Sequence, residues 1–289
     1  MRLLLTGANG QVGWEIARRA AAYGLMLDAR DRAGLDITDA PAVARAVAGA
    51  DLVINAAAYT AVDRAEQDEA AAFAVNCDGP ALLAAACAER GIPLFQLSTD
   101  YVFDGTKPGP WQEDDPAAPL GVYGQSKWQG EQAVRARLAR HLILRVSWVF
   151  GRHGHNFVKT MLRLAREREE LRVVADQVGR PTCAADIAAV LLELARRHAA
   201  GSDLAWGTYH YGGEPAVSWH EFACAIVAEG RAREPLAVQR VVAIGSADYP
   251  TPARRPANSV LDCSRLAATF GIAPRPWLSG LRRMLDERD

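Results

Sequence analysis

The stretch Arg2-Leu-Leu-Leu-Thr-Gly-Ala-Asn-Gly-Gln-Val-Gly13 decides the fold of this chain. It begins with a short apolar run, and beyond Gly13 small and apolar residues recur at helical spacing from Ile16 to Ala21. A strand, a glycine turn and a helix are therefore predicted. The glycines at 7, 10 and 13 match G-x-x-G-x-x-G, a turn that brings backbone N–H groups to a diphosphate at the helix N-terminus. A glycine turn that binds nothing is the alternative, but the strand-to-helix context favours nucleotide binding.

Further strands and helices alternate along the chain. Strands are predicted at 25–29, 51–58, 94–97, 141–147 and 171–175, and an alanine-rich helix at 69–90. This alternation indicates an α/β protein with a Rossmann-like, doubly wound parallel sheet. After residue 176 the pattern loosens, with a short strand at 208–211 and a helix at 219–229. We expect a dinucleotide-binding domain over 1–150, with part of 160–200 packed on it, and a smaller substrate-binding α/β lobe over 151–289.

The end of the second strand is where a dinucleotide fold reads the adenosine ribose. An acidic residue there selects NAD, whereas an arginine accommodates the 2′-phosphate of NADP. This chain has acidic and basic residues there, because Asp28 and Asp31 accompany Arg30 and Arg32. We therefore predict NADPH as the cofactor, with NADH tolerated.

Two later stretches would complete the cofactor site. Asp36-Ile37 is expected beneath the adenine, and a helix start at Asp39 is the alternative for this acidic patch. The strand at 51–58 ends in alanines, which leave room for the backbone of a cofactor at the carboxyl end of a strand. Tyr59 and Thr60 follow into the same crevice.

A tyrosine and a lysine four residues apart, Tyr123 and Lys127, share one face of a predicted helix. Alone, this spacing also occurs on helix surfaces by chance. A nearby ammonium stabilises a phenolate, so Lys127 is expected to lower the pKa of Tyr123 towards the working pH of a proton donor. The stretch Ser98-Thr-Asp-Tyr-Val-Phe103 ends the fourth strand, where polar side chains of an open α/β sheet meet ligands.

The composition is that of an ordinary soluble globular protein. Of the 289 residues, 50% are hydrophobic and 23% charged, with a net charge of -1. This balance disfavours nucleic acid and anionic membranes as partners. We expect no secretory signal and no apolar run long enough to span a bilayer. The five cysteines lack metal-ligand spacing, and a cytoplasmic protein is the interpretation.

Four motifs occur together here: Thr-Gly-Ala-Asn-Gly-Gln-Val-Gly at 6–13, Asn-Ala-Ala-Ala at 55–58, Ser-Thr-Asp-Tyr-Val-Phe at 98–103 and Tyr-Gly-x-x-Lys at 123–127. In this combination the chain resembles the extended short-chain dehydrogenase/reductases. Within them, it looks like the dTDP-4-dehydrorhamnose reductases at Leu-Asp-Ile-Thr-Asp (35–39), Val-Tyr-Gly-Gln-Ser-Lys (122–127), Arg-Val-Ser-Trp-Val-Phe (145–150), Asn-Phe-Val-Lys-Thr-Met (156–161) and Tyr-Pro-Thr-Pro-Ala-Arg-Arg-Pro (249–256). The likeness runs nearly end to end.

The resemblance implies reduction of the C4 ketone of dTDP-4-dehydro-L-rhamnose by NAD(P)H, giving dTDP-L-rhamnose for cell-surface polysaccharide. Tyr123 would donate the proton, Thr99 would hydrogen bond the same oxygen, and Lys127 would hold the nicotinamide ribose. The cofactor would contact Gly7, Asn9, Gly10, Gln11, Val12, Gly13, Arg32, Asp36, Ile37, Ala57, Ala58, Tyr59, Thr60, Tyr123 and Lys127. The nucleotide sugar would contact Val62, Thr99, Asp100, Tyr101, Tyr123, Trp148, Arg180 and either Arg254 or Arg255.

Related activities and one different class are the alternatives. The 4,6-dehydratases of the resembled superfamily carry an Asp-Glu pair after the catalytic threonine, whereas Tyr101 follows Asp100 here, so dehydration is disfavoured. A 4-epimerase is disfavoured only by the five stretches that look like the dTDP-4-dehydrorhamnose reductases. A reductase of another nucleotide sugar stays open, as does a non-catalytic subunit similar to the regulatory subunit of methionine adenosyltransferase. The intact Thr99, Tyr123 and Lys127 disfavour the pure binding role.

Metal binding and assembly are less defined. Some members of the resembled family are described as dimers bridged by magnesium through carboxylates. Glu15 and Glu287 are available for this, but Ala185 stands where another acid is expected, so a magnesium site stays open. His153 and His155 are expected in a solvated loop, since no carboxylate or cysteine accompanies them at ligand spacing. We expect a monomer or a homodimer.

Overall fold

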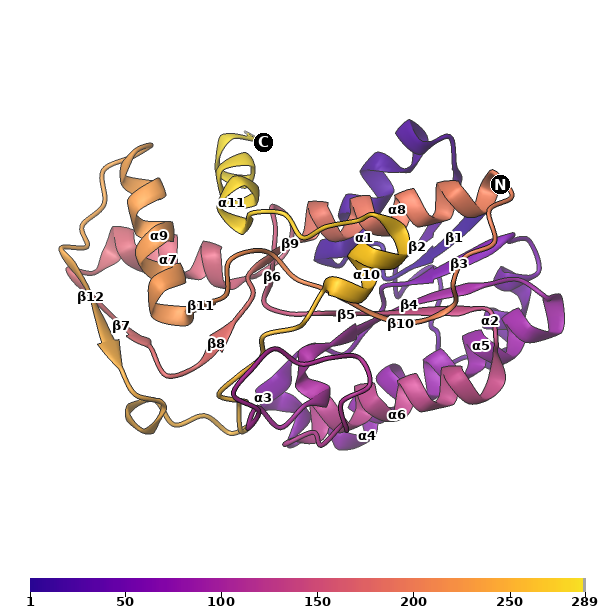
Figure 1. Ribbon diagram of the computed structural model, residues 1–289, viewed down its shortest axis with the longest axis horizontal. Coiled ribbons are helices and arrows are strands. Elements are labelled where there is room, and N and C mark those ends of the chain that lie inside the picture. Colours follow the sequence, from indigo (N-terminus) through magenta and orange to yellow (C-terminus); the bar gives the residue numbers. More distant parts are fainter. Residues whose placement is uncertain (288–289) are drawn as a thin grey trace.

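The computed structural model describes residues 1–287. Its central element is a six-stranded sheet in the order β10-β5-β4-β3-β1-β2, in which every neighbouring pair is parallel (Figure 1). The strands are β1 (Arg2–Thr6), β2 (Met26–Arg30), β3 (Leu52–Asn55), β4 (Leu94–Thr99), β5 (His141–Val146) and β10 (Gly207–Tyr211). The chain runs from β1 to β2 on one side and from β3 to β10 on the other. The switch point, where open α/β sheets bind ligands, therefore lies between β1 and β3.

Helices cover both faces of this sheet (Figure 1). On one face lie α1 (Gln11–Arg19) and α8 (Ala184–Ala199), and on the other α2 (Ala40–Val47), α5 (Gly79–Arg90) and α6 (Val122–Arg137). Alternate residues of β1 serve the two faces: Leu3 and Leu5 join the core beneath α1 and α8, and Leu4 joins the core beneath α2 and α5. Burial on both faces explains why β1 reads as a continuous apolar run.

A smaller C-terminal lobe packs beside the sheet, on the left of Figure 1. Its helices are α7 (Phe157–Glu167), α9 (Trp219–Arg231) and α11 (Trp277–Asp286). Its strands form three pairs: β6 (Val149–Phe150) with β9 (Thr182–Cys183), β7 (Glu170–Val174) with β12 (Arg240–Ile244), and β8 (Val178–Gly179) with β11 (Val217–Ser218). Phe150, Phe222 and Leu281 are buried at the centre of its own hydrophobic core.

The strand predicted at 171–175 forms, but its expected place in the central sheet is wrong. As β7 it pairs with β12 in the C-terminal lobe, and the sixth position of the central sheet is taken by β10, which pairs with β5. Apolar patterning predicts a strand without choosing its partner, which long-range packing decides. The chain thus enters the lobe after β5 and returns to the sheet through α8 and β10 (Figure 1).

The alanine-rich helix predicted at 69–90 forms as α4 (Glu69–Phe73), a π-helical segment η2 (Ala74–Asp78) and α5. By length and composition this stretch could cross a membrane, with a mean hydropathy of 1.4, so our expectation that no such run exists is wrong. In the structure α5 packs against α2 and α6 over the sheet. There, 39% of the most apolar window of the 69–90 stretch is buried.

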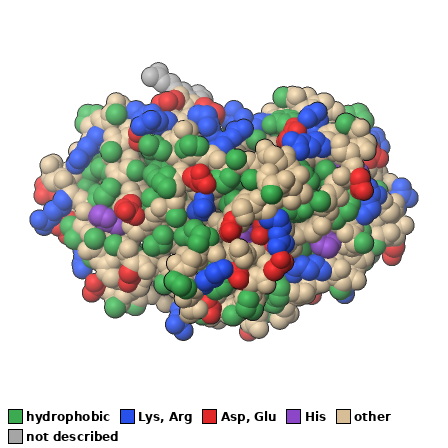
Figure 2. Space-filling view, in the orientation of Figure 1, with side chains coloured by type: hydrophobic (Ala, Val, Ile, Leu, Met, Phe, Trp, Pro, Cys, Tyr) green, Lys and Arg blue, Asp and Glu red, His purple; other side chains and the backbone are tan. Residues whose placement is uncertain are grey.

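Short elements connect these layers. They are the 3₁₀ segments η1 (Ala20–Tyr23), η3 (Asp100–Val102) and η4 (Ser246–Asp248) and the helices α3 (Val62–Ala65) and α10 (Ser264–Phe270). The space-filling view shows an indentation along the upper edge between the two parts of the molecule (Figure 2). Acidic and basic side chains are interspersed on the face seen there, in keeping with the near-zero net charge.

Candidate active site

The glycine turn lies at the switch point, between β1 and α1. Gly7 has φ 73°, and a Cβ there would come within 2.4 Å of the Ala57 backbone nitrogen. Only glycine therefore lets this turn lie against the end of β3. The Gly10 N–H donates to the Gly7 carbonyl at 2.9 Å, which closes the turn below the start of α1. The turn has the backbone geometry that diphosphate binding requires.

A cavity of about 240 Å³ opens beside this turn. It is lined by Gly7, Asn9, Gly10, Asp31, Arg32, Leu35, Asp36, Ile37, Ala56, Ala57, Ala58, Tyr59 and Val75. Most of the predicted cofactor residues are in this group, although they come from three separate segments of the chain. The fold therefore brings together the glycine turn, the end of β2 and the alanines after β3, as a dinucleotide site requires.

The four charged residues near the end of β2 have different partners in the structure. Arg30 pairs with Asp28 at 2.5 Å, away from the cavity lining. Asp31 accepts hydrogen bonds from the Asn9 amide at 2.7 Å and from the Gly34 N–H at 2.9 Å. Arg32 is exposed and lines the cavity. Arg32 is therefore the arginine of this group that faces the cofactor cavity.

The acidic patch at 36–39 serves two different places in the structure. Asp36 and Ile37 line the cavity, and hydrogen bonds from Thr38 together with nearby Arg32 lower the pKa of Asp36. Asp39 caps α2, because its side chain accepts from the Ala42 N–H at 3.1 Å.

Six predicted cofactor residues lie outside this cavity lining: Gln11, Val12, Gly13, Thr60, Tyr123 and Lys127. The Gln11 side chain donates to the Val149 carbonyl at 3.4 Å and accepts from the Asn156 amide at 3.1 Å. It therefore ties the glycine turn to the loop at 151–156. The solvated-loop prediction for His153 is incomplete, because its ring stacks on Trp14 and its Nε2 lies 2.9 Å from the Asn9 carbonyl.

Asn76, whose role the sequence left open, is a buried hydrogen-bonding residue. It lies in the π-helical segment and is 1% exposed. Its amide accepts from the Tyr59 N–H at 2.9 Å and donates to the Tyr59 carbonyl at 3.0 Å and to the Ser126 hydroxyl at 3.1 Å. Asn76 thereby fixes the cavity segment at Tyr59 to helix α6, one residue before Lys127.

Helix α6 carries Tyr123 in its first turn and packs directly on η3. A Cβ at Gly124 would fall 2.2 Å from the Tyr101 carbonyl oxygen, so glycine is required for this close approach. The Tyr101 ring meets the Tyr123 ring edge-on, with centroids 5.5 Å apart. Gly124 therefore explains why Tyr123 can lie against the carboxyl end of β4.

Thr99, Asp100 and Tyr123 meet there as an oxygen cluster. The Thr99 hydroxyl lies 3.0 Å from Asp100 Oδ1, accepts from the Tyr101 N–H at 3.2 Å and hydrogen bonds Tyr123. Asp100 is 2% exposed. Burial raises the pKa of Asp100 to about 7, although hydrogen bonds from Ser259 and Thr99 act in the opposite direction. The cluster thus joins a phenol, a hydroxyl and a carboxyl beside the cofactor site.

Lys127 lies one turn beyond Tyr123 and is 4% exposed. Its Nζ donates to the Leu97 carbonyl at 2.7 Å, and burial lowers the pKa of Lys127 to about 8. The expected lowering of the Tyr123 pKa is wrong for the chain itself, because burial raises the pKa of Tyr123 to about 12. Desolvation of the phenolate outweighs the opposing hydrogen bond with Thr99, so Tyr123 is protonated at neutral pH.

Trp148 and Arg180 form a second group, at the junction with the C-terminal lobe. Trp148 has φ 46°, a strained value for a bulky residue, and its ring stacks on Trp219 with centroids 3.5 Å apart. Arg180 reaches the Gly213 carbonyl and Glu214 Oε1, both at 3.4 Å. The Ser147 hydroxyl donates to the Arg180 carbonyl at 2.9 Å. This bond holds Arg180 next to the segment that carries Trp148.

The two arginines of the 249–259 segment differ. Arg255 pairs with Asp63 of α3 at 2.8 Å, and the Ala253 N–H donates to the same carboxylate at 3.2 Å. Arg254 is exposed. The Asp63 contact brings the segment against the residue next to Val62, so this part of the C-terminal lobe meets the start of α3.

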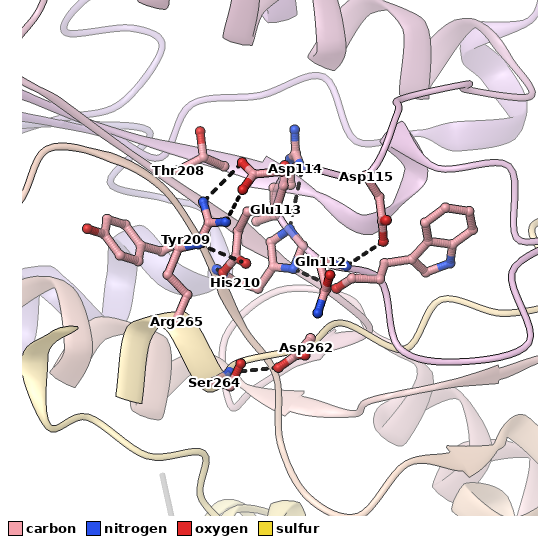
Figure 3. Close-up of polar contacts among 12 residues, drawn as sticks. Gln112, Glu113, Asp114, Asp115, Thr208, Tyr209, His210, Asp262, Ser264 and Arg265 are labelled. Carbon is pink, nitrogen blue, oxygen red and sulfur yellow. Dashed lines mark hydrogen bonds and ion pairs between the residues drawn. The ribbon is translucent and has the colours of Figure 1, made fainter. Parts of the chain in front are cut away.

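A charge-paired cluster of Glu113, Glu131, Arg145, His210 and Arg265 lies behind the oxygen cluster. The Arg145 guanidinium donates twice to Glu131, at 2.9 and 2.7 Å, and once to the Glu113 carbonyl at 3.3 Å. Figure 3 shows Glu113, Asp114 and Arg265 lying beside His210. The backbone N–H of His210 donates to Glu113 Oε1 at 3.1 Å. These contacts hold the loop between η3 and α6, which carries Glu113, against β5 and β10.

The carboxylates considered for magnesium are paired with arginines. Glu15 pairs with Arg19 at 2.8 Å, and Glu287 pairs with Arg18 at 2.9 Å. Within residues 1–287 no group of three or more His, Cys, Asp or Glu side chains is arranged to hold a metal ion.

Sequence reasoning missed several residues of the site. Leu35 and Val75 line the cavity as ordinary apolar residues, and Ser259 and Asp63 reach the oxygen cluster and Arg255 from segments far away in the chain. Trp219, the stacking partner of Trp148, follows a helix cap, Ser218, and carries no motif. Only tertiary contact identifies these residues.

Reduction of a carbonyl requires a nicotinamide site next to a proton donor. Here the doubly wound sheet places the glycine turn and the oxygen cluster at the carboxyl ends of β1 and β4, separated only by β3. The fold is therefore that of a Rossmann-type, short-chain dehydrogenase/reductase-like protein.

Comparison with known proteins is more specific. The chain belongs to the RmlD substrate binding domain family, whose model matches residues 1–289. It is 50% identical to the dTDP-4-dehydrorhamnose reductase of Burkholderia thailandensis, over 96% of this chain and 95% of that protein. It is 46% identical to the reductase of the same name from Aggregatibacter actinomycetemcomitans, over 98% of each chain. The crystal structure of dTDP-4-dehydrorhamnose reductase from Bacillus anthracis in complex with NADP superposes with a TM-score of 0.92, at 35% identity and 99% coverage of both chains.

Proposed function

We propose that this chain reduces the C4 ketone of dTDP-4-dehydro-β-L-rhamnose to dTDP-L-rhamnose, with NADPH as the reductant. The observation that carries the proposal is the meeting of the Thr99 and Tyr123 hydroxyls at the end of β4, in a chain whose full-length relatives bear that reductase name. We place the reaction in the cytoplasm, in a monomer or a homodimer.

The proposed roles follow from the chemistry of the ketone. The bound dinucleotide supplies the hydride. Charge then develops on the C4 oxygen, where Thr99 donates a hydrogen bond and Tyr123 gives the proton. Burial holds the pKa of Tyr123 at about 12, which keeps the proton on the phenol until the more basic alkoxide forms. Lys127 is proposed to hold the nicotinamide ribose and to stabilise the phenolate that Tyr123 becomes.

The cofactor preference is proposed from the adenosine end of the cavity. Arg32 lines the cavity, whereas Arg30 is paired with Asp28 and Asp31 is occupied by Asn9 and Gly34. A guanidinium suits the 2′-phosphate of NADPH, and NADH is tolerated because Asp31 and Asp36 remain within the lining. Arg32→Ala is expected to lower kcat/KM for NADPH more than for NADH.

The sugar nucleotide is proposed to lie between the oxygen cluster and the C-terminal lobe. Val62, Asp100 and Tyr101 would line it on one side and Trp148 on the other. Its diphosphate would meet Arg180 and one arginine of the 249–259 segment. Arg255 stands beside Val62 through its pair with Asp63, whereas Arg254 is exposed. Tyr101 occupies the position at which a dehydratase of the resembled superfamily has its second carboxylate, which favours reduction over dehydration.

The test is loss of reduced-nicotinamide absorbance when the purified chain meets enzymatically generated dTDP-4-dehydro-L-rhamnose, with NADPH and NADH in parallel. We expect rapid oxidation of NADPH, slower oxidation of NADH, and dTDP-L-rhamnose as the product. Oxidation only with a different 4-keto nucleotide sugar would replace the substrate and keep the reaction. NADPH binding without any turnover would instead indicate a nucleotide-binding regulatory protein.

A further inference from the structure

We infer that Asp100 decides whether Thr99 has a hydrogen to give to the substrate oxygen. Asp100 is then a positioning residue that acts through Thr99. The inference rests on the proposed reduction, because it concerns the hydrogen bond that Thr99 gives to the C4 oxygen. It assigns to Asp100 a role beyond lining the sugar pocket.

The argument begins with the hydrogens available to Thr99. A threonine hydroxyl has one hydrogen and two lone pairs. One lone pair of Thr99 accepts the Tyr101 N–H at 3.2 Å. The hydroxyl also lies 3.0 Å from Asp100 Oδ1 and hydrogen bonds Tyr123, the side from which it would reach the substrate. Asp100 Oδ1 on one side and the C4 oxygen on the other would therefore compete for the single Thr99 hydrogen.

The protonation state of Asp100 settles this competition. An ionised carboxylate can only accept, so Thr99 must donate its hydrogen to Asp100 and has none for the C4 oxygen. A neutral carboxyl can donate from Oδ1 to the second lone pair of Thr99. The Thr99 hydrogen is then free to point at the C4 oxygen beside Tyr123. Only the neutral form of Asp100 therefore gives the alkoxide two donors, Thr99 and Tyr123.

The surroundings of Asp100 favour the neutral form. Its Oδ2 is buried and has no hydrogen-bond partner among the described residues, a costly state for an ionised oxygen. The groups that face it are the Ser259 hydroxyl from the C-terminal segment, Tyr123 from α6 and Tyr101 from its own segment. None of these three is a cation.

The nearest charges do not offset this burial. Asp63 and Arg255 act on Tyr101, but they neutralise each other as an ion pair at 2.8 Å. Lys127 directs its ammonium to the Leu97 carbonyl. Burial accordingly raises the pKa of Asp100 to about 7. Activity that depends on neutral Asp100 is complete below that pH and is lost as the pH rises through it.

The experiment compares pH profiles of kcat for the wild-type chain and Asp100→Asn. An asparagine amide donates to Thr99 at every pH, so the ratio of variant to wild type should rise above pH 7. The rise should be up to about tenfold per pH unit, because one lost oxyanion donor is worth about 10²–10³-fold in total. Asp104→Asn is the matched control: Asp104 caps its own turn by accepting from the Thr106 N–H at 2.8 Å, and its ratio should stay flat.

A second variant tests whether Asp100 acts through Thr99. Thr99→Val removes the hydroxyl, so its profile should lack the decline near pH 7, and Asp100→Asn added to it should change nothing further. If Asp100→Asn does not fold, the wild-type and Thr99→Val profiles decide the question between them. An active wild type with a flat ratio, or an unchanged decline in Thr99→Val, overturns the inference. A wild type without turnover at pH 6 overturns the proposed function instead.

Discussion

Two carboxyl groups on adjoining elements are buried almost equally and behave in opposite ways. Glu131 on α6 is 1% exposed, and Asp100 after β4 is 2% exposed. Burial acts to raise the pKa of Glu131, but Arg145 and Arg135 outweigh it and the net pKa is lowered. Asp100 has hydroxyl and backbone donors in place of arginines, and burial raises its pKa to about 7.

The difference shows that burial by itself does not assign a role to a charged side chain. Glu131 belongs to the charge-paired cluster, where side chains that stay charged hold the loop before α6 against the sheet. Asp100 belongs to the oxygen cluster, where the absence of a paired cation lets the proton come and go near neutral pH. Changes in the first cluster should therefore appear in stability, and changes in the second in activity.

The largest expected effect is in the oxygen cluster. Tyr123→Phe removes the proton donor and leaves the ring, so kcat/KM should fall by about 10²–10⁴-fold. Steady-state assays with NADPH measure this, and fluorescence titration should show that NADPH still binds. The free energy of unfolding should change by less than about 1 kcal/mol, because the ring packing is kept. Near-normal turnover would remove Tyr123 from its proposed role.

Breaking the charge-paired cluster should cost stability. Arg145→Met leaves Glu131 buried with only Arg135 beside it, at 2.8 Å. Removal of one partner of a buried ion pair destabilises by about 3–5 kcal/mol, which urea unfolding at pH 7.5 would measure. The control is Arg145→Met with Glu131→Gln, which should recover part of the loss because no buried carboxylate is left behind. Equal stability of Arg145→Met and wild type would contradict the assignment of this cluster.

A pH-dependent effect is expected at His210, which is fully buried in the same cluster. Burial and the neighbouring Arg145 lower the pKa of His210 to about 3. The unfolded chain therefore binds a proton near pH 6.5 that the folded chain refuses, and stability is lost as the pH falls below that value. His210 should contribute about 1.4 kcal/mol of this loss per pH unit.

His210→Gln should flatten this slope. Unfolding midpoints at pH 7, 6 and 5 for the wild type and the variant would show it as a difference that shrinks with falling pH. His155→Gln, at an exposed position of the 151–156 loop, is the matched control and should keep the wild-type slope. A slope unchanged by His210→Gln would mean that His210 accepts a proton in the folded state.

The smallest effect is expected for an ion pair that lies near the surface. Asp63 and Arg255 form an ion pair with side chains 41% and 24% exposed, in contrast to the 1% of Arg145 and Glu131. Solvent screens such a pair, so Asp63→Asn should cost less than about 1 kcal/mol. Unfolding in 0.05 and 0.5 M salt would measure the residual contribution. A loss as large as that of Arg145→Met would show that exposure does not separate the two pairs.

Much of the fold could be predicted from the sequence. The β1 turn, the helix at 69–90 and the strands β3 and β4 were predicted from local patterns, because apolar periodicity and glycine spacing act over a few residues. The predicted strand ends, 58 and 97, differ from the observed ends at Asn55 and Thr99. The partner of β7 could not be predicted. Its choice of β12 over β5 depends on contacts between segments about seventy residues apart.

The residues proposed for catalysis were also chosen from local patterns, but their electrostatics could not be predicted in this way. A Tyr-x-x-x-Lys spacing shows that Tyr123 and Lys127 share a helix face, and it suggested that lysine would lower the pKa of the tyrosine. The structure instead directs Lys127 to the Leu97 carbonyl and buries Tyr123. Desolvation depends on everything packed around a group, so a pKa cannot be read from spacing alone.

The sequence by itself determined the class of protein and the glycine turn after β1, and it supplied the proposed proton donor, because each is encoded in a contiguous motif. Only the tertiary structure decided which buried carboxyl is paired and which can hold a proton. Glu131 meets Arg145 from β5, whereas Asp100 meets Ser259 from the far end of the chain. Such partners are set by the packing of distant segments, and it is the partner that determines the charge.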